Sequence, residues 1–121
     1  MITVFVIGRV IFGLFIVFSG FNHIKNFKHT RAYTQSLGVP ASGFLTVLTG
    51  LMLLFGGISF LLWQWVDLGI LVLVLFFVPV TLIAHAFWKK KDTTQRVTEM
   101  HSFMGNMMIL GLLLIIFPLL Y

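Results

Sequence analysis

The chain has 121 residues, of which 60% are hydrophobic and 9% are charged, and its formal net charge is +5 at pH 7. About a quarter of the residues of a soluble domain are charged, so this composition excludes an ordinary water-soluble domain and predicts a membrane protein. The absence of cysteine excludes thiol–disulfide chemistry, iron–sulfur clusters and cysteine-ligated zinc.

Four apolar segments are each long enough to cross a bilayer, which takes roughly 20 residues of helix. We therefore expect an all-α membrane protein, a four-transmembrane-helix bundle that forms a single domain over residues 1–121. The basic residues cluster in the connections, so we expect the lipid bilayer as a partner and no nucleic acid. The predicted helices cover approximately residues 2–23, 42–62, 68–88 and 99–120.

The first predicted helix has one charged residue, Arg9, inside its apolar stretch. A secretory signal peptide is the competing interpretation, but the positive n-region and the small-residue cleavage site are missing. Arg9, Gly13, Ile16, Gly20 and His23 follow one another at steps of 4, 3, 4 and 3 residues, so they share one face of a helix. We expect that face to point into the bundle, where small residues let helices approach closely.

The first connection is basic and interleaved with aromatic residues. From Ile24 to Gly38 it contains Lys25, Lys28 and Arg31 and no acidic residue. This pattern predicts a short interfacial helix between the first and second spans, stopped by the glycine.

The second span is apolar except for three hydroxyl residues, and paired tryptophans follow it as an interfacial anchor. We expect the hydroxyl groups of Thr46, Thr49 and Ser59 to bond to the carbonyl four residues earlier, which requires no functional role. After the third span a basic turn follows, and Thr93 or Thr94 is the expected N-cap of the last helix.

The distribution of positive charge predicts the orientation of the protein. Of the 8 Lys and Arg residues, seven lie in the first and third connections and none lies in the second. Cytoplasmic loops carry the excess of Lys and Arg. We therefore expect both basic loops in the cytoplasm and both termini outside.

Arg9 is predicted to lie about 10 Å inside the outer end of its helix, where a charge is costly unless it finds a partner or reaches the headgroups. Asp67 is the only acid expected on that side, so we predict a structural ion pair between Arg9 and Asp67. Two alternatives stay open. Arg9 extends to the outer headgroups while Asp67 is solvated, or Arg9 binds an anionic ligand or a quinone carbonyl through its guanidinium.

A cluster of polar residues is predicted at the cytoplasmic ends of the helices. It comprises His23, His85 and His101, each from a different helix, with Asp92 and Glu99. Three interpretations remain: interfacial or packing histidines, a polar site for a quinone head or proton transfer, and a metal or haem site. No motif of a hydrolase, nucleotide-binding protein or metalloprotease occurs. The sequence therefore assigns no catalytic residue and no metal site.

Four stretches, spread over residues 7–106, carry a family resemblance that extends over nearly the full length. They read IGRVIFGLFIVFSGFNHI, SLGVP, TGLMLLFGG and HAFWKKKDTTQRVTEMHSFMGN. The order HxFW, then D, E and FxxN, is the most specific part. On these motifs the chain resembles the DoxX family of four-helix membrane proteins.

The resemblance implies an integral protein of the bacterial plasma (inner) membrane. The family is named for association with a thiosulfate:quinone oxidoreductase, and some members are linked to membrane redox or oxidative-stress complexes. It therefore implies an accessory subunit with a redox protein partner, a homo-oligomer being a further option, and no catalytic activity of its own. The implied cofactor is a quinone, with haem the weaker candidate. On the family pattern, the positions of a site are Arg9, His85, Trp88, Asp92, Glu99 and Asn106.

Two other functions are weighed against this one. A non-catalytic scaffold that binds a protein partner needs nothing beyond the bundle itself. A small-molecule transporter of four helices fits the length, but such exporters use a carboxylate in the first helix, and this chain has none there.

Overall fold

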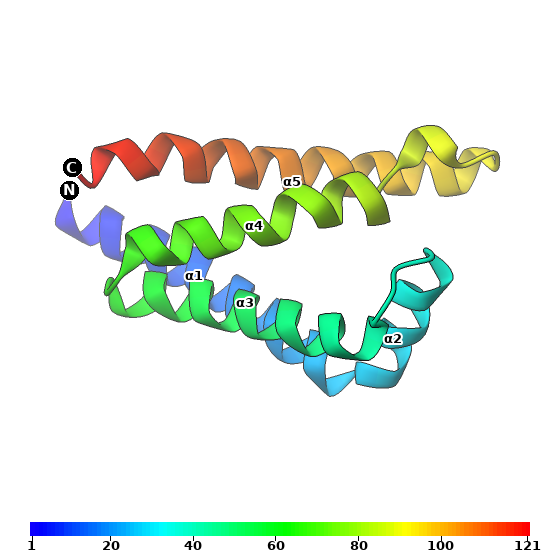
Figure 1. Ribbon diagram of the computed structural model, residues 1–121. Helices are drawn as coiled ribbons and strands as arrows, with labels where there is room; N and C mark the ends of the chain where they lie inside the picture. Colours follow the sequence, from blue (N-terminus) through cyan, green and yellow to red (C-terminus); the bar gives the residue numbers. More distant parts are fainter. The chain divides into compact units, whose positions relative to one another are not determined.

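The computed structural model describes residues 1–121, and all its regular elements are helices (Figure 1). The prediction of an all-α protein is thus confirmed. Four helical segments are long and apolar enough to cross a membrane, and the third of them, Val66–Lys89, comprises α4 and η1. The elements are α1 (Ile2–Lys25), α2 (Phe27–Ser36), α3 (Ser42–Leu62), α4 (Val66–Ala84), the 3-10 helix η1 (Phe87–Lys89) and α5 (Thr93–Leu119).

The chain forms two compact units, Met1–Leu73 and Val74–Tyr121. The first unit contains α1, α2, α3 and the start of α4, and the second contains the rest of α4, η1 and α5. The short helix predicted between the first two spans is present as α2. The prediction of a single domain over the whole chain stays a prediction.

Within the first unit, α1 and α3 lie side by side and run in opposite directions (Figure 1). A Cβ atom on Gly20 would lie 2.9 Å from the Gly50 carbonyl oxygen, and one on Gly57 would lie 2.9 Å from the Gly13 carbonyl oxygen. Neither position has room for a side chain, so the two backbones touch at both places. Gly13 and Gly20 are buried together with Ile16, which confirms that this face of α1 points inward.

The hydroxyl groups of α3 are largely satisfied by its own backbone. Thr46 and Thr49 each donate to the carbonyl four residues earlier, at 2.7 Å, as predicted. Ser59 instead donates to the Gly56 carbonyl, three residues earlier, at 2.7 Å. The prediction for Ser59 was therefore wrong about the accepting carbonyl. A hydroxyl on Cβ reaches either the i−3 or the i−4 carbonyl depending on its rotamer.

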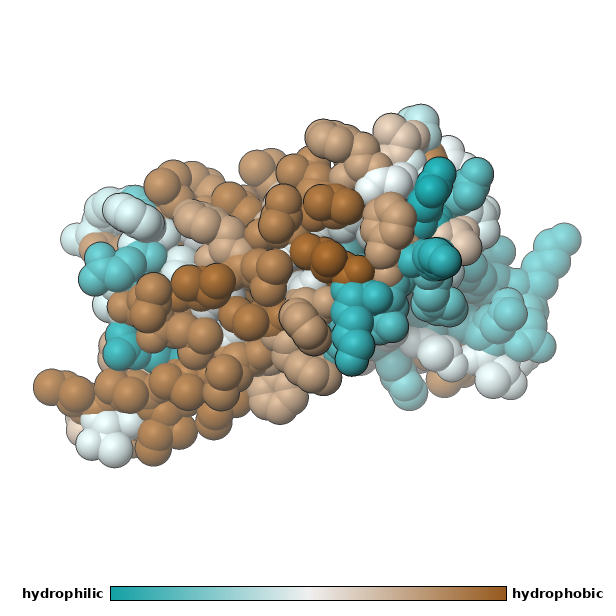
Figure 2. Space-filling model, turned by 90° about the horizontal axis from the view of Figure 1, so that it is seen from below, coloured by the Kyte–Doolittle hydropathy of each residue, from teal (hydrophilic) through white to brown (hydrophobic).

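Large apolar side chains are exposed along all the spanning helices. Phe15, Leu75 and Ile115 expose 69%, 67% and 63% of their surface, one in each of α1, α4 and α5. Figure 2 shows hydrophobic side chains covering most of the face seen there, with hydrophilic ones gathered mainly toward its ends. Monomeric soluble proteins rarely expose so much contiguous apolar surface, whereas a lipid bilayer covers it.

The third predicted helix ends earlier than expected. The α-helix stops at Ala84 rather than near residue 88. Ala86 has φ −77° and ψ 75°, and the Phe87 amide donates to the His85 carbonyl at 2.9 Å, which together make an inverse γ-turn. The turn redirects the chain before η1. His85 is therefore not helical, whereas the sequence predicted that it would be.

The last helix, α5, begins at Thr93, before the apolar span that the sequence predicts from about residue 99. Its N-cap is Asp92, whose carboxylate accepts a hydrogen bond from the Gln95 amide at 3.1 Å. The prediction of Thr93 or Thr94 as the cap was therefore wrong. An aspartate ranks above threonine at this position, and its negative charge also complements the positive end of the helix dipole.

Candidate functional site

His85, in the turn after α4, forms an ion pair with Glu99 of α5. Its Nδ1 atom lies 2.7 Å from Oε2 of the carboxylate, and the two side chains expose 23% and 20% of their surface. An ionised carboxylate can only accept hydrogen bonds, so the imidazole donates from Nδ1. Its Nε2 atom is then the nitrogen left to meet a ligand, and the carboxylate fixes the orientation of the ring.

Three aromatic rings adjoin this pair. Phe87 and Trp88 of η1 both contact Phe103 of α5 edge to face, with ring centroids 5.4 and 5.7 Å apart, and they contact each other at 5.3 Å. Glu99 and Phe103 are four residues apart and so lie on one face of α5, along which the segment beginning at His85 packs. Trp88 leaves 48% of its surface exposed. The site therefore combines an oriented imidazole with an open indole ring.

The remaining predicted residues of this unit are more dispersed. Asn106 is half-buried on the same face of α5 as Glu99, two turns or about 10 Å further along the helix. Asp92 is occupied as the cap of α5. His101 is exposed. Of the predicted polar cluster in this unit, the structure joins His85 to Glu99.

His23 belongs to the first unit and has a packing role there. Its Nε2 atom lies 2.7 Å from the Thr49 hydroxyl oxygen and so ties α1 to α3. The threonine hydrogen is already donated to the Leu45 carbonyl at 2.7 Å, so His23 is the donor in this bond. No group of three or more His, Asp or Glu side chains lies close enough to hold a metal ion.

Arg9 of α1 lies over an aromatic ring. Its guanidinium carbon is 5.5 Å from the centroid of the Phe5 ring, which itself contacts Trp63 edge to face at 4.6 Å. A cation above a ring is stabilised by its quadrupole, while the Arg9 Nε atom is buried without a hydrogen-bond partner. The Asp67 carboxylate accepts from the Leu68 amide at 2.9 Å. The ion pair between Arg9 and Asp67 stays a prediction.

Sequence reasoning missed three residues of these contacts. Phe87 and Phe103 were not identified as members of the site, and Thr49 was not identified as the partner of His23. The HxFW and FxxN motifs contain both phenylalanines, so the aromatic signal was present. The pairing of Thr49 leaves no trace in the sequence, because it depends on how two helices pack.

A comparison with models of protein families gives one match. The family model described as DoxX matches residues 4–86 of the chain. The chain belongs to the DoxX family. The match includes Arg9 and His85 and ends before Trp88, Glu99 and Asn106. No curated protein and no solved structure matches the chain. This DoxX protein is a multi-pass membrane protein by family and by its four apolar helices.

Proposed function

We propose that this DoxX protein is a non-catalytic membrane subunit of a redox complex, and that His85, Glu99 and Trp88 hold the headgroup of a quinone. The observation that carries the proposal is the 2.7 Å contact between His85 and Glu99 beside a tryptophan with 48% of its surface exposed. The redox association is what the resemblance to the DoxX family implies.

The side chains of this site fit the chemistry of a quinone head. Such a head is a flat ring with carbonyl oxygens at its edge, and an exposed indole offers an apolar face on which a flat ring stacks. With Nδ1 donating to Glu99, a protonated His85 ring would also donate from Nε2 to a carbonyl oxygen at the ring edge, and Glu99 holds the imidazole in one orientation. A bound quinone supplies two-electron redox chemistry that the side chains of the chain lack.

Other candidate residues have different places in the proposal. Phe103 supports Trp88 from α5 through their edge-to-face contact at 5.7 Å. Asn106 lies about 10 Å along the helix from Glu99, so it would meet a different part of a long ligand. Arg9 belongs to the other unit and is not needed for this site.

Native mass spectrometry tests the proposal on the full chain, extracted from its own membrane in a mild detergent. We expect a retained mass that matches a quinone, together with the masses of any protein partners. His85→Gln should lose the quinone, because the glutamine amide does not reproduce the imidazole held by Glu99. His101→Gln is the matched control and should keep it, because His101 is an exposed histidine of α5 that takes no part in the contact between His85 and Glu99.

Two outcomes would overturn the quinone site. One is a homo-oligomer that carries phospholipid alone, which supports the scaffold function instead. The other is equal retention of the quinone by both histidine variants. A haem would be recognised by its visible absorption and by its mass.

The proposed location is the bacterial inner membrane, with the basic loops in the cytoplasm and both termini outside. The chain has no cysteine, so single cysteines report its orientation directly. Gln64→Cys, between α3 and α4, should react with a membrane-impermeant maleimide in intact cells. Ser36→Cys, at the end of α2, should react only after the membrane is opened. The reverse pattern would contradict this orientation.

A further inference from the structure

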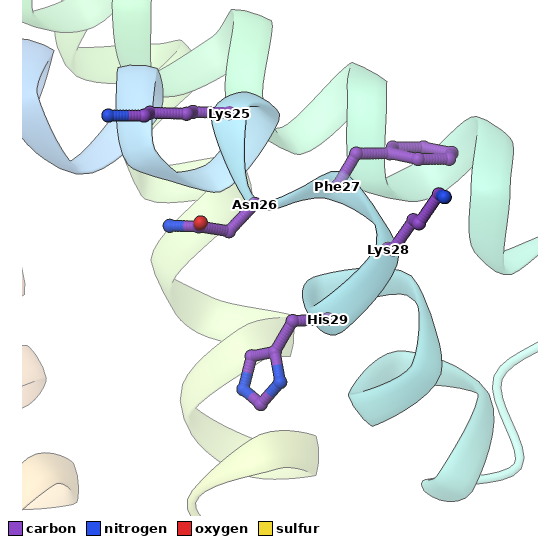
Figure 3. Close-up of a pocket in the computed structure, with 5 residues that line it drawn as sticks. All are labelled: Lys25, Asn26, Phe27, Lys28 and His29. Carbon is purple, nitrogen blue, oxygen red and sulfur yellow. The ribbon is translucent and has the colours of Figure 1, made fainter.

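The junction of α1 and α2 is a positively charged hollow. It has a volume of about 470 Å³ and is lined by Lys25, Asn26, Phe27, Lys28 and His29. Figure 3 shows Lys25 and Lys28 projecting to different sides of the turn, so the cations surround the turn instead of converging on one enclosed point. The hollow is thus an open surface that several small groups could occupy together.

The positive charge of this surface is not balanced by acids. No acidic residue precedes Asp67 in the sequence, and Lys25, Lys28 and Arg31 take part in no ion pair, the ion pair of the structure being His85 with Glu99. All three cations are exposed. Arg31 lies against the beginning of α3, its Nε atom being 3.5 Å from where a Cβ of Gly43 would lie. Asp67, the acid of the first unit, lies in α4 and not at this junction, so the anions that neutralise this surface come from elsewhere.

The position of the surface at the end of α1 indicates which anions it can meet. It lies at the end of α1, whose 24 residues make a helix about 36 Å long, enough to cross the hydrocarbon and reach the headgroups. Apolar rings accompany the cations: the Lys25 ammonium lies 6.0 Å from the centroid of the Phe21 ring, and Phe27 lines the hollow. Cations next to apolar rings suit a molecule with a charged head and an apolar tail.

We propose that the α1–α2 junction is a docking surface for anionic phospholipids, whose phosphates lie against Lys25, Lys28 and Arg31. Charge complementarity and the position of the surface at the end of a helix long enough to span the membrane support this assignment. Each juxtamembrane lysine increases the affinity of a protein for anionic lipid about fivefold. Removal of Lys25 and Lys28 together should therefore weaken the preference for anionic lipid by about 25-fold.

The test measures lipid binding to the purified full chain by native mass spectrometry, with phosphatidylglycerol and phosphatidylcholine of identical acyl chains. Lys25→Gln with Lys28→Gln should reduce the preference for phosphatidylglycerol by the factor given above. The matched control, Lys90→Gln with Lys91→Gln, removes the same charge from the other basic loop, where the adjacent Asp92 already offsets part of the positive charge, and should change the preference less. Lys25→Arg with Lys28→Arg keeps the charge and should bind as the unchanged chain does.

A second measurement needs no variant and so does not depend on their folding. Hydrogen exchange of residues 25–36 should be slower in nanodiscs of phosphatidylglycerol than in nanodiscs of phosphatidylcholine, with a smaller difference for residues 89–96. Equal binding of the two lipids, or equal losses from both lysine pairs, would overturn the proposal and leave the surface to an acidic protein segment. If inorganic phosphate alone displaces the lipid, the surface is a free-phosphate site, and lipid docking is wrong.

Discussion

The contact between α1 and α3 can be tested at a single glycine. A Cβ atom on Gly20 would lie 2.9 Å from both the Gly50 carbonyl oxygen and the Leu54 amide nitrogen, whereas ordinary contact begins at 3.4 Å. Gly20→Ala therefore requires the two helices to separate by about 0.5 Å, and a gap of that size forfeits about a quarter of the dispersion energy of each contact it opens. Because the obstacles are backbone atoms, no rotamer change relieves them.

We expect Gly20→Ala to lower the free energy of unfolding by about 2 kcal/mol, the middle of the range for an overpacked core. The assay is unfolding of the detergent-solubilised protein by titration with dodecyl sulfate, followed by circular dichroism. The matched control is Gly8→Ala in the same helix, where a Cβ would meet nothing within 4 Å. That variant should be as stable as the unchanged chain or slightly more stable, because alanine favours the helix.

The double variant of Gly20→Ala with Gly57→Ala tests the same helix contact at two places. A Cβ on Gly57 meets the Val17 amide nitrogen at 2.8 Å and the Gly13 carbonyl oxygen at 2.9 Å, so Gly57→Ala should cost about as much as Gly20→Ala. The same separation of the helices relieves both clashes, so the double variant should cost less than the two single costs together. If Gly20→Ala is as stable as Gly8→Ala, the two backbones are not in contact and the reasoning is wrong.

Three further predictions concern polar residues. Asp92→Ala should destabilise the start of α5 by about 1 kcal/mol because it removes the N-cap, whereas Asp92→Asn should be close to neutral; hydrogen exchange in the first turn of α5 measures the difference, and equal protection in both variants would argue against the cap. A double-mutant cycle of His85→Ala and Glu99→Ala should give a coupling energy of about 1 kcal/mol, and a coupling near zero would mean that the pair does not form. A cycle of Arg9→Leu and Asp67→Asn should give a coupling of at least about 1 kcal/mol if the two are ion-paired, while additive effects would leave Arg9 held by the aromatic ring beneath it.

The sequence alone determined the class of this protein and most of its helices. Apolar runs of about 20 residues can be satisfied only as helices in a bilayer, so the composition dictated the four spans. The basic, acid-free stretch after the first span predicted α2, and the spacing of Gly13 and Gly20 predicted the buried face of α1. These features depend on hydrophobicity and helical period, which are local properties of a sequence.

Only the tertiary structure decided how the candidate site is made. The helical pattern continues past Ala84, yet the chain turns at Ala86, and this turn brings His85 to Glu99 and Trp88 to Phe103. Each of these contacts joins α5 to the segment before it, so local propensity cannot reveal them. The same holds for His23, whose partner Thr49 is 26 residues away. A residue's type and spacing indicate which chemistry it offers, but its partner is set by which helix faces meet.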